Sequence, residues 1–108
     1  MRFSVTFLSS FGGLILAGAV SAASQSDIEG CDQSADRERR MASCSRLIED
    51  LSQPAKARAV AHNNRGNALR AKGENDRALA DYDEAIKLRP DGTYFYNRGN
   101  AYRDQRRQ

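Results

Sequence analysis

Two cysteines are the side chains of this sequence best placed to do chemistry. Cys31 and Cys44 are the only cysteines among 108 residues, and an even pair in an exported chain is typical of a disulfide. A disulfide that closes the loop between Cys31 and Cys44 would stabilise the fold by about 3 kcal/mol. The bond is feasible if a helix begins near Asp36, because a start at Ser34 would carry Cys44 too far along the helix axis. Separate buried thiols and an intermolecular bridge are the alternatives.

The remaining reactive side chains do not form a catalytic or metal-binding set. His62 is the only histidine, and together with the two cysteines it falls short of the four ligands of a zinc site. Asp81, Asp83 and Glu84 are close in sequence but lack the spacing of a calcium loop. We therefore interpret them as the solvated face of a helix. The sequence predicts no catalytic residue, no cofactor and no metal.

The N-terminus has the pattern of an export signal. Arg2 supplies a positive charge, and residues 5–20 are apolar except for Thr6, Ser9 and Ser10. Val20-Ser21-Ala22 then places small side chains before a cleavage point. We predict a signal peptide at residues 1–22 and a mature protein that is periplasmic or secreted, without stable membrane insertion after cleavage. An uncleaved anchor is the alternative, although the strongly apolar part is shorter than the roughly 20 residues of a spanning helix.

The charge balance argues against nucleic acid as a partner. Lys and Arg number 17 and Asp and Glu number 14, for a net charge of +3. Arginines and tyrosines near the C-terminus could contact nucleic acid by charge and stacking. Acidic residues are nevertheless plentiful, and export separates the chain from nucleic acid.

Apolar residues recur at helical spacing and nowhere alternate with a period of two. The pattern predicts an all-α protein with about four helices after the signal peptide, preceded by an irregular segment at 23–35. Pro54 suits the first turn of a helix, and Gly73 suits the left-handed residue beyond a helix end. The predicted helices cover about 36–51, 54–72, 76–89 and 94–107.

One five-residue sequence occurs twice. Asn64-Arg65-Gly66-Asn67-Ala68 recurs as Asn97-Arg98-Gly99-Asn100-Ala101, and the unit at 59–92 resembles the tetratricopeptide repeat family. The resemblance implies a short α-solenoid of antiparallel helix-turn-helix repeats. It divides the mature chain into a cysteine-bearing segment with one helix at 23–53 and a repeat region at 54–108. That region would hold one full repeat, 59–92, and one half repeat, 93–108.

The resemblance also assigns packing roles. Small residues would permit close helix crossing, an aromatic ring would fill the space between helices, and a proline would end the second helix. The sequence departs from the family at His62 and Arg65, where Trp and Leu are frequent. The residues matched to packing positions are Gly66, Ala78, Tyr82, Ala85, Pro90 and Gly99.

In this family the first helix of each repeat lines a concave groove. Amide side chains on such a face can hydrogen-bond a peptide backbone, and arginine can bind a carboxylate with two donors. The residues that would line the groove here are Asn63, Asn67, Arg70, Asn100 and Arg103. The predicted function is that of an exported, non-enzymatic module that binds a protein or peptide. The alternatives are a piece of a longer repeat protein and a module that self-associates through its last helix.

The last helix should pack with one face inward. We expect Phe95, Ala101 and Tyr102 to face the preceding helix, with Arg98, Asp104 and Gln105 on the opposite side. Part of the Tyr94–Tyr96 aromatic cluster should remain exposed, because the predicted half repeat has no second helix to cover it.

Overall fold

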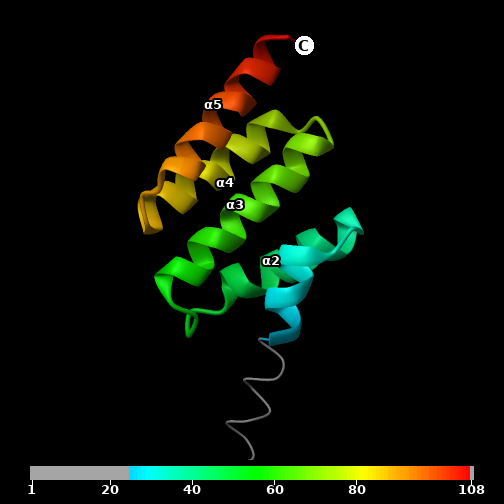
Figure 1. The fold of residues 1–108 in the computed structure, drawn as a ribbon, viewed down its shortest axis with the longest axis vertical. Coiled ribbons are helices and arrows are strands. Elements are labelled where there is room, and N and C mark those ends of the chain that lie inside the picture. Colours follow the sequence, from blue (N-terminus) through cyan, green and yellow to red (C-terminus); the bar gives the residue numbers. More distant parts are fainter. Residues whose placement is uncertain (1–24, 108) are drawn as a thin grey trace, which may run out of the picture.

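The computed structural model describes residues 25–107, so the predicted signal peptide at 1–22 lies outside the described residues. Residues 25–33 are helical, and four further helices follow, with no strand in this range. Each helix runs antiparallel to the one before it, and α3 lies between α2 and α4 while α5 packs on α4 (Figure 1). The predicted all-α architecture is therefore confirmed. The four helices are α2 (Arg37–Glu49), α3 (Ala55–Ala71), α4 (Asn75–Leu88) and α5 (Gly92–Arg106).

Residues at the helix ends set these boundaries. The side chain of Asp36 accepts hydrogen bonds from the backbone N–H groups of Glu38 and Arg39, which caps α2. The side chain of Asp91 accepts from the N–H of Thr93 at 2.8 Å, so α5 begins at Gly92, two residues earlier than predicted. Gly73 has the predicted positive φ, 83°, after α3. Side-chain caps are thus present at the starts of α2 and α5, whereas α3 and α4 begin without one.

The segment predicted to be irregular at 23–35 is helical at 25–33, so the cysteine-bearing segment holds two helices rather than one. Gly30 permits this helix to lie against α2, since a Cβ added there would be 2.9 Å from the Cβ of Ser43. Ile28 and Cys31 are its only apolar side chains, apart from glycine. Two apolar positions are too few to show a helical period, which is why the sequence pattern missed it.

Cys31 and Cys44 form the predicted disulfide. Their Cα atoms are 4.7 Å apart, and both side chains are buried. The bond joins helix 25–33 to α2 within a small apolar cluster that also contains Leu47 and Ala61. A covalent link thus holds helix 25–33 on α2, and the apolar cluster packs this hairpin against α3.

The crossing of α3 and α4 lies at the predicted glycine. A Cβ added to Gly66 would be 2.8 Å from Cε1 of Tyr82, whose side chain is fully buried. Ala78 and Ala85 are fully buried on the same helix, and Pro90 follows its end at Leu88. Small side chains and one aromatic ring thus fill the crossing of α3 and α4.

The predicted orientation of α5 is wrong in part. Tyr94 and Ala101 are the buried residues of this helix, whereas Phe95 and Tyr102 are 47% and 46% exposed. Tyr94 and Ala101 are two helical turns apart, so they share the packed face of α5. Phe95 and Tyr102, each one position further along, point outward.

Two polar residues of α5 also differ from expectation, because they face the body of the protein. Asp104 accepts a hydrogen bond from Nε of Arg70 on α3 at 2.8 Å, and Gln105 donates to Asp76 on α4. These contacts fix the rotation of α5 about its axis and leave its aromatic side chains outside the core.

Candidate peptide-binding site

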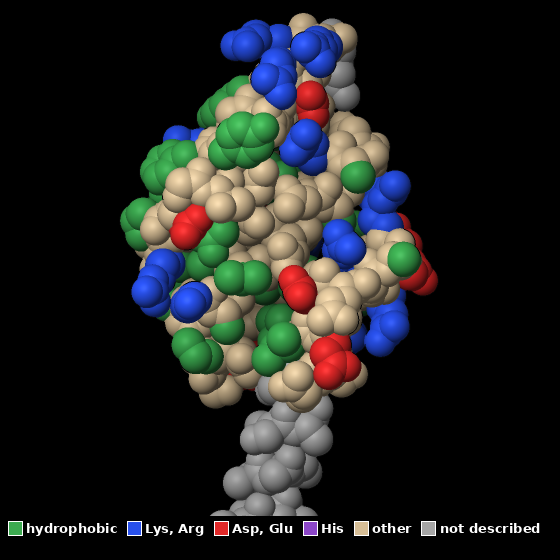
Figure 2. Space-filling view, viewed as in Figure 1, with side chains coloured by type: hydrophobic (Ala, Val, Ile, Leu, Met, Phe, Trp, Pro, Cys, Tyr) green, Lys and Arg blue, Asp and Glu red, His purple; other side chains and the backbone are tan. Residues whose placement is uncertain are grey.

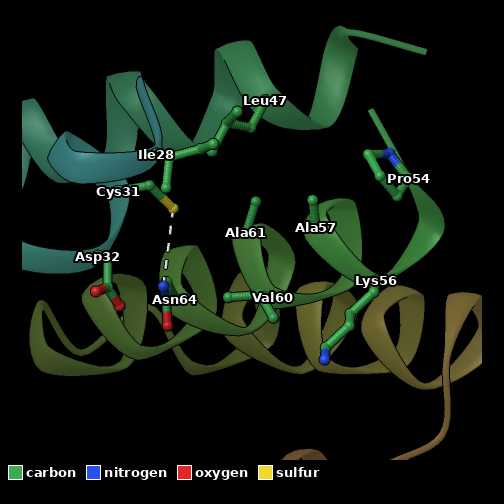
Figure 3. Close-up of a pocket in the computed structure, with 10 residues that line it drawn as sticks. All are labelled: Ile28, Cys31, Asp32, Leu47, Pro54, Lys56, Ala57, Val60, Ala61 and Asn64. Carbon is green, nitrogen blue, oxygen red and sulfur yellow. Dashed lines mark hydrogen bonds between the residues drawn. The ribbon is translucent and has the colours of Figure 1, made fainter. Parts of the chain in front are cut away.

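A pocket of about 360 Å³ lies between helix 25–33, α2 and α3 (Figure 3). We call it the α3 pocket. Ile28 and Cys31 line it from helix 25–33, Leu47 from α2, and Val60 from α3. Its lining is almost entirely apolar, so it suits an apolar group rather than an ion.

The hollow follows from small side chains on one face of α3. Ala57, Val60, Ala61 and Asn64 recur at helical spacing and all line the pocket. Because two of the four are alanines, the facing helix 25–33 cannot close the space, although the disulfide holds that helix nearby. Asn64 Nδ2 donates to Sγ of Cys31 at 3.8 Å across the gap.

Opposite charges stand at the two ends of the α3 pocket. Asp32 lies beside Asn64 at one end, and Lys56 lies near Pro54 at the other (Figure 3). Both charged residues are exposed, and within residues 25–107 neither forms an ion pair. The pocket is thus an apolar site with a carboxylate at one end and an ammonium group at the other.

The predicted groove residues take part in contacts between helices. Asn63 is buried and its Oδ1 accepts from Asn97 Nδ2 of α5 at 2.9 Å, while Asn67 Oδ1 accepts from the Tyr82 hydroxyl at 2.6 Å. Arg70 binds Asp104, and this hydrogen bond raises the pKa of the Arg70 guanidinium. Ligand binding by these residues stays a prediction.

The second pair of predicted groove residues lies on α5. Asn100 Oδ1 accepts from Arg103 Nη2 at 2.6 Å, and this contact is exposed to solvent. The structure therefore does not bring Asn100 and Arg103 together with the α3 pocket, whose lining comes from helix 25–33, α2 and α3.

A buried charged cluster occupies the positions where the sequence departs from the family. Asp81 is 4% exposed, so its assignment to a solvated face is wrong. Arg65 donates to both Asp81 oxygens, at 2.8 and 2.7 Å, and His62 Nδ1 lies 2.9 Å from Oδ1. Burial alone would raise the pKa of Asp81, but the hydrogen bonds from Arg65 and His62 outweigh it and the pKa lies below its ordinary value.

This cluster ties three helices together. Arg65 Nη1 also donates to Ser45 Oγ of α2 at 3.0 Å, so one α3 side chain links α2 to α4. The sequence signal was the pair of polar residues, His62 and Arg65, at inward-facing positions, since such residues need a buried acidic partner.

In the described part of the chain, no group of three or more His, Cys, Asp or Glu residues could hold a metal ion. None of its helices is long and apolar enough to cross a membrane.

The comparison with protein families assigns the central hairpin. The family model described as tetratricopeptide repeat matches residues 59–91, which cover most of α3 and all of α4. No curated protein and no solved structure matches the chain. Repeats of this kind typically act as protein-interaction modules with extended concave surfaces. The chain therefore contains a tetratricopeptide repeat at residues 59–91.

Proposed function

We propose that the protein is an exported module that binds a peptide segment of a partner protein in the α3 pocket. The observation that carries this proposal is the apolar hollow of about 360 Å³ between helix 25–33 and α3. Its volume lies within the roughly 300–1,000 Å³ of pockets that bury a ligand. A leucine-sized or phenylalanine-sized side chain is the group that an apolar lining would bind most favourably.

The ends of the α3 pocket define the flanks of the peptide. An acidic residue next to the apolar side chain would meet Lys56, and a basic residue on its other side would meet Asp32. Asn67 lies one turn beyond Asn64 on α3 and would extend the contact to the peptide backbone. Its Oδ1 is taken by Tyr82, while its amide nitrogen makes no hydrogen bond within residues 25–107.

The disulfide supports the exported part of the proposal. Structural disulfides persist in oxidising compartments and are rare in the cytosol. Both cysteines are buried and bonded, which is compatible with a periplasmic or secreted protein. N-terminal sequencing of secreted protein should give Ala23 as the first residue, and a start at Met1 would contradict cleavage.

Selection from a library of random peptides displayed on phage tests the binding site. We expect selected peptides to share one apolar residue between an acidic and a basic residue. Val60→Glu should weaken their binding roughly 10–150-fold, because burying such a side chain contributes about 1.5–3 kcal/mol. Leu51→Glu is the matched control, since Leu51 is 78% exposed and does not line the pocket. Equal affinity for both variants would refute the site.

Self-association through α5 is a second candidate. Phe95, Tyr96 and Tyr102 are between 46% and 71% exposed, and such a cluster marks a contact surface. Sedimentation of the protein alone would show a concentration-dependent dimer if a second copy covers this surface.

A further inference from the structure

Three glycines mark where a helix can approach the next one most closely, and the third has no neighbour. Gly30 of helix 25–33 meets Ser43 of α2, and Gly66 of α3 meets the ring of Tyr82 on α4. A Cβ added to Gly99 of α5 would meet nothing within 4 Å in the described part of the chain. The first two close approaches are each filled by the helix that follows.

The surroundings of Gly99 repeat those of Gly66. The side of α3 that faces α4 carries His62, Arg65, Gly66 and Leu69. In the repeat, these four positions align with four residues of α5, which we call the α5 face. The residues of the α5 face are Phe95, Arg98, Gly99 and Tyr102.

The two equivalent faces differ in burial. His62 and Leu69 are 6% and 1% exposed, whereas Phe95 and Tyr102 are 47% and 46% exposed. Figure 2 shows hydrophobic side chains over α5, with Lys and Arg side chains gathered towards its C-terminal end. The α5 face is thus the uncovered counterpart of a surface that α4 covers on α3.

Arg98 has donors left for a further acidic partner. Its Nη1 forms an ion pair with Asp83 of the preceding helix at 2.9 Å, whereas Nη1 of Arg65 donates to the neutral hydroxyl of Ser45. Nε and Nη2 of Arg65 bind the carboxylate of Asp81. The same two nitrogens of Arg98 make no hydrogen bond to any residue of 25–107, and the guanidinium lies 5.1 Å from the Phe95 ring centre.

We propose that the α5 face binds a helix of a partner protein that carries a carboxylate and an aromatic side chain at adjacent positions. The carboxylate would pair with Nε and Nη2 of Arg98, and the aromatic ring would lie on Gly99. This arrangement repeats the contact of Asp81 and Tyr82 with Arg65 and Gly66. The α5 face shares no residue with the α3 pocket, so the two proposals stand or fall separately.

Charge favours an acidic partner over a second copy of this chain. Residues 98–107 contain four arginines and one acidic residue. That acidic residue, Asp104, is paired with Arg70. Two α5 helices packed face to face would bring these arginines together, and like charges at an interface oppose binding. The arginines are Arg98, Arg103, Arg106 and Arg107.

The chain itself supplies the probe. A 14-residue peptide with the sequence of α4 carries the pair Asp81-Tyr82 and four carboxylates against two cations. Added at up to about 1 mM to the ¹⁵N-labelled protein, it should shift the amide signals of residues 95–102. Peptides with Asp81→Asn or Tyr82→Ala should bind roughly tenfold more weakly or worse.

Variants of the protein locate the binding surface. Arg98→Gln should weaken peptide binding roughly tenfold or more, and Arg107→Gln, which removes the same charge outside the α5 face, should leave it within about twofold. Gly99→Leu should abolish binding because its side chain fills the site of the aromatic ring. Its melting temperature should not fall, since the position is open.

Three outcomes would overturn the proposal. The first is an absence of amide shifts at the highest peptide concentration. The second is shifts confined to α3, because the peptide would then be replacing the protein's own α4. The third is an equal loss of peptide affinity in Arg98→Gln and Arg107→Gln. A stable dimer of the protein alone that Gly99→Leu disrupts would assign the α5 face to a second copy instead.

Discussion

The same substitution, glycine to alanine, can be tested at Gly66 and at Gly99, which have the same local sequence. Both lie in the middle of Asn-Arg-Gly-Asn-Ala and both are inside a helix. Replacing either with alanine favours the helix by about 1 kcal/mol, because glycine is the poorer helix former. That gain is common to the two sites, so the difference in stability between the two variants isolates what the added methyl group meets.

At Gly66 the methyl group meets Tyr82. The added Cβ would be 2.8 Å from Cε1 and 3.1 Å from both Cδ1 and Cζ, well inside van der Waals contact. The ring cannot easily move, because it is fully buried and its hydroxyl donates to Asn67 at 2.6 Å. Overpacking of this kind typically costs about 1–3 kcal/mol. Gly66→Ala should therefore be less stable than Gly99→Ala by about that amount.

Urea unfolding followed by circular dichroism measures both free energies of unfolding. Gly99→Ala should gain up to about 1 kcal/mol, and Gly66→Ala should be neutral or lose up to about 2 kcal/mol. In a Tyr82→Leu background the difference between the two sites should shrink, because the ring that causes it is gone. Equal stabilisation by both substitutions in the presence of Tyr82 would refute the account of the α3–α4 crossing.

The disulfide and the buried Asp81 give two further predictions. Since Cys31 and Cys44 are the only cysteines, a reducing agent should act on this bond alone and lower the free energy of unfolding by about 3 kcal/mol, with no further effect on a Cys31→Ala, Cys44→Ala variant. Asp81→Asn should cost about 3–5 kcal/mol near neutral pH, because it leaves the charge of Arg65 without its partner. The pKa of Asp81 is lower in the folded state, so its contribution is present above the unfolded-state value of about 3.9 and is lost as the pH falls through the folded-state value. The stability gap between wild type and Asp81→Asn should thus narrow in acid, and a gap that widens there would contradict the assignment.

The sequence was most informative where one residue acts locally. Pro54 and Gly73 act on their own helix ends, so their types alone predicted those boundaries to within a residue or two. The identical five-residue sequences predicted the repeat and the position of Gly66. These inferences required no knowledge of the partners of any side chain.

The errors arose where a distant partner decides the outcome. Asp81 resembles its exposed neighbour Glu84 in sequence, and only the approach of Arg65 and His62 from α3 distinguishes it. Helix 25–33 has too few apolar residues to show a period, and it is held by α2 through Gly30 and the disulfide. Without these contacts in view, the α3 pocket could not be predicted, since one of its walls belongs to that helix.

In the described structure, the apolar faces of the helices are covered to different extents at the N-terminal hairpin and at α5. Helical repeats bury their apolar faces on their neighbours, and about three units are usually needed for stability. At the N-terminal end, the hairpin of helix 25–33 and α2 is closed by a covalent bond and covers part of α3. It does not cover the face completely, because the side chains of Ala57 and Ala61 are small, and the α3 pocket results. At α5 the close-approach glycine is uncovered in the described structure and two of its neighbours are half exposed. We therefore expect peptide binding in the α3 pocket to be lost when the disulfide is reduced. Binding at the α5 face should be unaffected by reduction under conditions in which the α3–α5 region remains folded.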